Sequence, residues 1–194
     1  MRKITFDIET RNTFEDVGSN DAVDLDISLL CTHDSKTGEY DTFMHDDLDR
    51  LWPLLEKADM LIGYNSDHFD IPLLNKYYHG DLTKIKSLDI LKEIKNSTGR
   101  RFKLDSVAEA TLGTNKSGDG LDAIKWWNSG EIDKIKKYCL DDVRITKEVY
   151  DYARENGILK YKDKITHEVK EIKLDTSKWE DKEEEENGMV QSLF

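Results

Sequence analysis

The chain of 194 residues has only two cysteines and two prolines. Cys31 and Cys139 are far apart in the sequence and belong to no CxxC motif, so the sequence predicts neither a disulfide framework nor a zinc site. No apolar run reaches the roughly 18–20 residues that a membrane-spanning helix needs. The first ten residues, MRKITFDIET, also lack the apolar core of a signal peptide. We therefore expect a cytoplasmic protein with reduced cysteines and no membrane partner.

Positive charge is scarce, with 29 basic and 41 acidic side chains and a net charge of −12. This balance argues against a nucleic-acid partner, because phosphate contacts usually come from Lys and Arg. The distribution is uneven, however: residues 1–75 carry 6 basic and 17 acidic side chains, and residues 76–125 carry 10 basic and 7 acidic ones. An acidic region followed by a basic one suits a metal site beside a phosphate-contacting face, or an ordinary solvated surface.

Apolar periodicity predicts strands that alternate with helices, which favours an α/β layer fold. The expected strands cover residues 1–8, the hairpin arms 27–34 and 39–45, and residues 60–65. The expected helices cover residues 46–57, 69–79, 86–96 and 102–113, and a long segment from 131 to 156 that Gly157 ends. Residues 10–26 are expected to form a polar loop.

The C-terminal part differs in composition from the rest. Residues 158–174 predict a small β-hairpin with KDK at its turn, and after about residue 176 the sequence becomes WEDKEEEENG before the apolar ending MVQSLF. We expect a main domain over 1–157, an appended hairpin over 158–175 and a flexible acidic tail over 176–194.

The first of three acidic motifs is Asp7-Ile8-Glu9, at the end of the first expected strand. Residues two apart on a strand point to the same face, so both carboxylates would project toward one place. The same spacing recurs in the acidic tail at residues 181–183, which shows that it is weak evidence by itself.

The second motif runs from Asn65 through Phe69 to Asp70, at the junction between an apolar strand and a helix. Loops at such junctions carry function, and helix amides there can receive anions. A purely structural alternative is that Asn65 or Asp70 caps the helix and Phe69 packs in the core.

The third motif places Tyr138 and Asp142 four residues apart on the long helix, where they share a face. Asp141 is an alternative acid about a quarter-turn away. Carboxylates gathered from three elements repel one another and are costly to bury unless a cation is bound. Oxygen ligands favour Mg²⁺ or Mn²⁺ over zinc, and paired ions roughly 3.5–4 Å apart are typical of displacement at phosphorus. The pattern therefore indicates phosphodiester hydrolysis.

FDIET, GYNSDHFDIPLL and YCLDD, in this order, resemble the three motifs of the DEDD superfamily of 3′→5′ exonucleases, whose fold is ribonuclease H-like. A tyrosine four residues before the last acid is typical of the DEDDy branch. KLDSVAEATLG and the turn SKTGEY further resemble the proofreading domain of family-B DNA polymerases, over about residues 1–155. The resemblance implies a mixed sheet flanked by helices. Since no polymerase sequence follows, it also implies a freestanding exonuclease.

By this resemblance, Asp7, Glu9 and Asp142 would hold one divalent ion. Asp7 would also bridge to a second ion, on which Asp70 acts through water. Tyr138 would orient the attacking water. Asn65 and Phe69 would shape the pocket for the 3′-terminal nucleotide.

The implied substrate is the 3′ end of single-stranded DNA. RNA trimming stays open as an alternative, because the motifs do not report the 2′-hydroxyl. A third possibility is a nucleic-acid-binding or replication-accessory module that does not hydrolyse its ligand.

Candidate phosphate contacts lie in the one net-basic stretch, at Arg100, Arg101, Lys103, Lys116 and Lys125. Trp126 and Trp127 would either stack a base or pack in the core. His68 lies within the second motif but receives no role. The ending Gln191–Phe194 partly resembles the sliding-clamp-binding peptides of bacterial replication proteins, with Val190 where their first glutamine stands.

Overall fold

The computed structural model describes residues 1–114 and 120–181, and its centre is a five-stranded mixed sheet of order β3-β2-β1-β4-β5. Its strands are β1 (Lys3–Thr10), β2 (Ile27–Asp34), β3 (Tyr40–Met44), β4 (Met60–Gly63) and β5 (Ser87–Asp89). β1 pairs antiparallel with β2 and parallel with β4. The predicted α/β fold, a mixed sheet flanked by helices, is confirmed.

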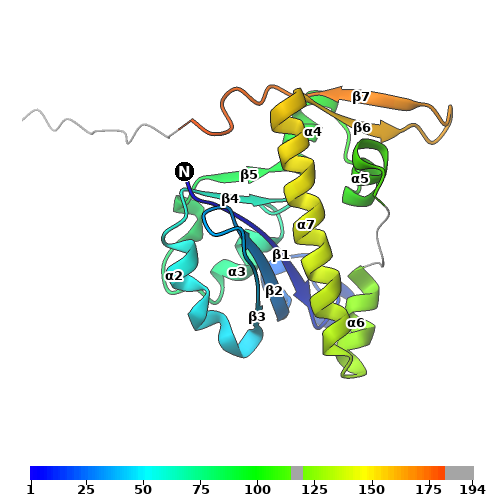
Figure 1. Ribbon diagram of the computed structural model, residues 1–194. Coiled ribbons are helices and arrows are strands. Elements are labelled where there is room, and N and C mark those ends of the chain that lie inside the picture. Colours follow the sequence, from blue (N-terminus) through cyan, green and yellow to red (C-terminus); the bar gives the residue numbers. More distant parts are fainter. Residues whose placement is uncertain (115–119, 182–194) are drawn as a thin grey trace, which may run out of the picture.

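Helices cover both faces of this sheet (Figure 1). They are α1 (Phe14–Val17), α2 (Trp52–Leu55), α3 (Asp70–Asn75), α4 (Ile90–Thr98), α5 (Leu104–Leu112), α6 (Gly120–Asn128) and α7 (Ile132–Asn156), with 3₁₀-helices η1 (Ala22–Asp24), η2 (His45–Arg50) and η3 (Leu82–Lys84). One core cluster joins Ile4 and Phe6 of β1 to α2 and α3, and α7 packs on the opposite face. Within the described ranges, no helix has the length and apolar character needed to cross a membrane.

The segment expected to be a polar loop, residues 10–26, contains more structure than its composition suggests. Thr13 and Asp16 form a capping box: the Thr13 hydroxyl accepts from the Asp16 amide at 3.1 Å, and the Thr13 amide donates to the Asp16 carboxylate at 2.8 Å. This pair starts α1, because it satisfies amides that have no partner within a helix. The expectation of a loop is therefore corrected to a short helix followed by η1.

Two other expected helices are divided. Residues 46–57 form η2 and then α2, and Pro53 lies in the first turn of α2, where its missing N–H is not needed. Residues 86–96 begin as strand β5 and become helix α4 only after Asp89, whose carboxylate accepts from the amides of Leu91 and Lys92. An N-cap aspartate thus marks the change from strand to helix.

The expected C-terminal hairpin is present as β6 (Ile158–Lys162) and β7 (Val169–Lys173), which pair antiparallel. Gly157 ends α7 with φ 69°, a left-handed conformation that costs glycine little. Leu159 of β6 and Ile172 of β7 are buried in a core cluster shared with α4, α5 and α7. The hairpin therefore packs against the main domain through these two residues, and it lies beside α5 in Figure 1.

Residues 176–181 differ from the expected flexible tail, because they pack against the main domain. Trp179 is 4% exposed, stacks on Tyr150 at 5.8 Å and donates from Nε1 to Glu93 at 3.0 Å. The Glu180 carboxylate accepts from Lys3 at 2.7 Å and from Tyr150 at 2.6 Å. The remaining tail, the peptide Gln191–Phe194 and Lys116 lie outside the described residues.

Candidate active site

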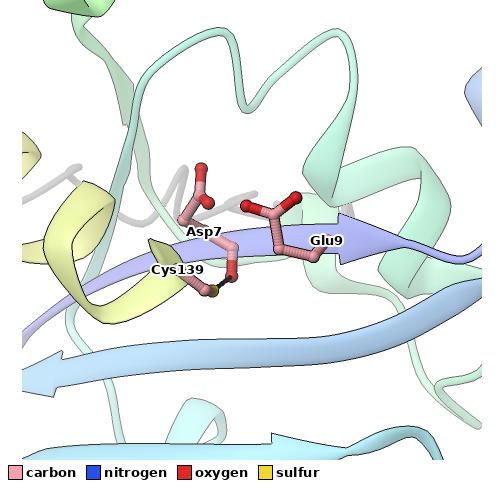
Figure 2. A group of neighbouring side chains, drawn as sticks. All are labelled: Asp7, Glu9 and Cys139. Carbon is pink, nitrogen blue, oxygen red and sulfur yellow. Dashed lines mark hydrogen bonds between the residues drawn. The ribbon is translucent and has the colours of Figure 1, made fainter. Parts of the chain in front are cut away.

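Strand β1 presents two carboxylates on one face. Asp7 and Glu9 alternate with Phe6 and Ile8, which point into the core shared with α2 and α3. Figure 2 shows both carboxylates on the same side of the strand. The period of two along a strand therefore places them together, as the sequence predicted.

Asp70 reaches the same strand from α3. Its Oδ1 accepts a hydrogen bond of 3.1 Å from the backbone amide of Ile8, the residue between Asp7 and Glu9. Asp70 is buried, and burial raises the pKa of its carboxyl to about 7. A carboxyl so far from its ordinary range is held where ionisation is costly, and a neighbouring cation would remove that cost.

Helix α7 supplies the remaining two predicted residues, Tyr138 and Asp142, both buried and one turn apart. Burial raises the pKa of the Tyr138 phenol, and the charges of Asp142, Glu9 and Asp7 raise it further. The phenol therefore keeps its proton at neutral pH and can donate a hydrogen bond. Asp141, the alternative acid, instead forms an ion pair of 3.6 Å with Arg144.

One pocket of about 380 Å³ brings the predicted catalytic side chains together. Among its walls are the residues predicted from sequence as catalytic or as shaping the pocket: Asp7, Glu9, Asp70, Tyr138, Asp142, Asn65 and Phe69. The structure thus gathers residues from β1, the β4–α3 junction and α7 around a single cavity. Their chemical roles stay predictions.

The donor set of this pocket fits a hard divalent cation. A ligand oxygen of Asp7, one of Glu9 and the Cys139 sulfur lie within 4.8 Å of one another, while Asp70 and Asp142 line the same pocket outside that group. The Cys139 thiol approaches the Asp7 carbonyl oxygen at 3.3 Å, on the backbone side of Asp7 and away from the carboxylates (Figure 2). Burial raises the pKa of this thiol, so it stays protonated and leaves the carboxylate oxygens as the ligands.

The turn after β4 is held by a residue that the sequence did not single out, Asp89. Its carboxylate accepts from the amide of Asn65 at 2.7 Å and from that of Asp67 at 3.3 Å, while it also caps α4. Asn65 has φ 70°, a left-handed conformation that asparagine tolerates better than most residues. Asp89 therefore positions Asn65 at the pocket wall. The signal in the sequence was an aspartate just before an apolar helix.

Gly63 makes this turn possible. A Cβ placed on Gly63 would lie 2.4 Å from the Cβ of Ser66, a side chain that is fully buried. We expect Gly63→Ala to lower the free energy of unfolding by about 1–3 kcal/mol through overpacking. Urea denaturation measures the change. The double variant Gly63→Ala/Ser66→Gly removes the clash and should recover part of the loss, whereas no recovery would contradict this account.

Other walls of the pocket come from segments to which the sequence analysis assigned no role. Phe14 of α1 packs edge-on against Phe69 at 6.2 Å, and both rings line the pocket. Leu121 and Ile124 of α6 add apolar surface. The Thr13-x-x-Asp16 spacing was the available signal for α1, because this pattern starts helices. Nothing in the sequence placed α6 beside β1.

The predicted phosphate contacts fall outside this pocket. Arg100, Arg101 and Lys103 line a second cavity of about 490 Å³, although Arg101 also donates to Asn65 Oδ1 at 2.6 Å. Lys125 pairs with Asp122 on α6 at 2.8 Å. His68 is exposed. Trp126 and Trp127 are partly buried against the core cluster that includes residues of β2 and α7.

The raised pKa of Asp70 predicts an unusual dependence of stability on pH. In metal-free buffer the folded protein keeps a proton on Asp70 that the unfolded chain gives up above about pH 4, so this group destabilises the fold as pH rises from about 4 to 7. Asp70→Asn keeps the size and the acceptor but removes the titration. Above pH 7 we expect the free energy of unfolding of the variant to exceed that of the wild type by about 2–4 kcal/mol. This corresponds to a Tm that is higher by about 5–10 °C.

Thermal melts at pH 5 and pH 8 in EDTA measure this difference. Asp49→Asn, an exposed aspartate, is the control and should show no such pH dependence. Added Mn²⁺ should reverse the order, because the wild type alone keeps the full ligand set. A difference between the variants that is the same at both pH values would contradict the assignment to Asp70.

These features define a chain with an acidic pocket at the centre of a mixed sheet. A family model for the RNase_H superfamily matches residues 4–154, and the chain belongs to this superfamily. Among solved structures, it is similar to the family B DNA polymerase of the hyperthermophilic archaeon Pyrobaculum calidifontis, with 23% sequence identity and a TM-score of 0.61. The similarity covers 79% of this chain and 24% of the polymerase chain. No curated protein matches the sequence.

Proposed function

We propose that the protein is a metal-dependent 3′→5′ exonuclease of the DEDDy type, which hydrolyses phosphodiester bonds at the 3′ end of single-stranded DNA. The observation that supports this most strongly is the single pocket lined by Asp7, Glu9, Asp70, Tyr138 and Asp142. Membership of the RNase_H superfamily supports a nuclease that uses divalent metal.

In this proposal the carboxylates of Asp7, Glu9 and Asp142 would hold one ion. Asp7 would also bind a second ion, on which Asp70 would act through water. Mg²⁺ and Mn²⁺ both suit all-oxygen ligands. When bound, the ions lower the pKa of water and neutralise charge that develops on the phosphate. The Ile8 amide fixes the Asp70 carboxylate, and the strand fixes the spacing of Asp7 and Glu9.

The other walls of the pocket position the substrate. The protonated phenol of Tyr138 donates a hydrogen bond to the attacking water and orients it toward the phosphorus. Phe14 and Phe69 form an apolar wall against which the terminal base packs, and Asn65 offers a polar contact at the rim. A pocket of about 380 Å³ has the size of a small-ligand site and suits one terminal nucleotide.

The proposal keeps the division of the chain into an exonuclease domain (1–157), a hairpin (158–175) and a tail (176–194). Within the tail, residues 176–181 pack against the main domain. Docking of Gln191–Phe194 to a sliding clamp is supported by sequence alone.

The test is digestion of oligonucleotides labelled at the 5′ end, in Mg²⁺ or Mn²⁺, with DNA and RNA of equal sequence. We expect stepwise shortening of the DNA from its 3′ end, and none in EDTA. Preference for the RNA would establish the exoribonuclease instead. Binding without hydrolysis in either metal would establish the accessory module and overturn the proposal.

A further inference from the structure

A second cavity, of about 490 Å³, lies between the start of α5 and the C-terminal hairpin. Its basic lining side chains are Arg100, Arg101, Lys103, Lys162 and Lys164, and its acidic ones are Asp105 and Glu109. We call this cavity the basic groove. In a chain with a net charge of −12, a groove in which five basic side chains face two acidic ones is a local reversal of charge. Its field attracts anions.

These five basic side chains are exposed, and within residues 1–114 and 120–181 none of them forms an ion pair with an acidic side chain. Elsewhere basic side chains commonly have such partners, as in Arg2 with Asp34 at 2.7 Å and Lys92 with Asp67 at 2.6 Å. Within the described residues these five side chains are therefore not held in ion pairs, and they can contact phosphate groups.

Aromatic rings lie beside this charge. Phe102 lines the basic groove, and its ring centroid is 4.4 Å from that of Tyr161 on β6. The Arg100 guanidinium lies 5.0 Å from the Phe102 ring and 5.5 Å from the Tyr161 ring. Aromatic rings combined with arginine commonly bind unpaired bases, whose faces are free to stack. In a duplex the base faces are already stacked on one another, and only the base edges are accessible.

The hairpin brings Lys162 and Lys164 to the basic groove. The Lys160 amide of β6 donates to Thr111 Oγ1 of α5 at 2.9 Å, and Leu159 is fully buried beside α5 and α7. Between the two lysines, the Asp163 carboxylate accepts from the amides of the hairpin turn at 2.9 and 3.0 Å. That acidic side chain is therefore occupied by the turn, while its two basic neighbours line the basic groove.

The basic groove is joined directly to the catalytic pocket. Arg101 lines the groove and donates at 2.6 Å to Asn65 Oδ1, a wall of the pocket. Tyr64, another pocket wall, donates from its hydroxyl to the Phe102 carbonyl at 2.8 Å. A strand that leaves the pocket beside Asn65 can therefore enter the basic groove at Arg101.

We propose that the basic groove binds the phosphodiester backbone of a single strand upstream of its 3′-terminal nucleotide, and that the hairpin β6–β7 is part of the substrate track. This inference rests on the proposed function for the direction of the strand. The hairpin side chains Lys162 and Lys164 contact phosphates, and Arg100 with Phe102 and Tyr161 supports the bases.

The test measures binding of fluorescent dT16 by anisotropy in EDTA, over a series of salt concentrations, with the full chain. We expect Lys162→Gln/Lys164→Gln to lower the slope of log affinity against log salt by about 1.4, since each phosphate contact on a single strand contributes about 0.7. At about 0.1 M salt this corresponds to roughly 25-fold weaker binding. The control is Lys36→Gln/Lys57→Gln, which removes equal charge at a different cavity and should change affinity less than twofold.

Equal affinity of the groove variant and the control would overturn the inference, as would failure of the wild type to bind dT16 at low salt. Tighter binding of a 16-base-pair duplex would overturn the single-strand assignment. Parallel titration of rU16 separates DNA from RNA as the strand. If the groove variant weakens binding but the wild type hydrolyses nothing in Mn²⁺, the groove stands and the proposed exonuclease fails.

Discussion

Replacing Asp7 with asparagine is expected to lower the rate of hydrolysis by about 10³-fold or more, because Asp7 is the one residue proposed to contact both ions. Asparagine keeps the size of the side chain but removes the negative charge. Bound metal supplies several kcal/mol of stabilisation to the transition state, and a loss of about 4 kcal/mol corresponds to about 10³-fold in rate. Single-turnover digestion of a 5′-labelled oligonucleotide in saturating Mn²⁺ measures the effect.

The control for Asp7→Asn is Asp49→Asn, which removes one charge from an exposed position outside the pocket. It should retain full activity, and both variants should keep the wild-type circular dichroism spectrum. Activity of Asp7→Asn within tenfold of the wild type would contradict the assignment of Asp7 as a shared ligand. Residual activity that did not rise in proportion to the concentration of the variant protein would point to a contaminating nuclease.

Replacing Tyr138 with phenylalanine is expected to slow hydrolysis by about 10²-fold, the effect of losing one hydrogen-bond donor aimed at the reacting groups. The ring should stay in place, because Tyr138 packs edge-on against Trp126 at 5.9 Å and is almost completely buried. Metal affinity should be unchanged, since the phenol orients water and does not bind metal. Pre-steady-state rates and calorimetric Mn²⁺ titrations measure the two quantities separately.

Tyr150→Phe is the matched control for Tyr138→Phe, because Tyr150 is a buried tyrosine on the same helix whose hydroxyl donates to Glu180 instead of facing the pocket. It should leave hydrolysis unchanged and cost about 1 kcal/mol in stability through the lost hydrogen bond. Weakened Mn²⁺ binding by Tyr138→Phe would contradict the proposed role of the phenol and make it a ligand.

Local periodicity explains which parts of the site were predictable from sequence. Asp7 with Glu9 and Tyr138 with Asp142 share faces because strands repeat every two residues and helices about every 3.6. The hydrogen bond from Ile8 to Asp70 joins residues 62 positions apart, and no local rule encodes it. Only the order of the three motifs and their resemblance to a known family brought these elements together before the structure did.

The apolar walls of the pocket were not predictable in the same way. Phe14 and Ile124 lie in short elements whose positions depend on packing with distant segments. The basic groove was likewise only partly predictable. Arg100, Arg101 and Lys103 fall in the net-basic stretch of the sequence. Lys162 and Lys164 come from a hairpin that was expected to lie outside the main fold. Burial of Leu159 docks that hairpin on α5, and burial depends on tertiary contacts.

The most direct test of the central claim is X-ray diffraction near the manganese absorption edge, from crystals of the full chain grown in Mn²⁺. The account predicts anomalous density in the pocket, within ligand distance of Asp7 and Asp142, and its loss in crystals of Asp7→Asn. Manganese bound only elsewhere, or a pocket with no anomalous density at saturating Mn²⁺, would contradict it.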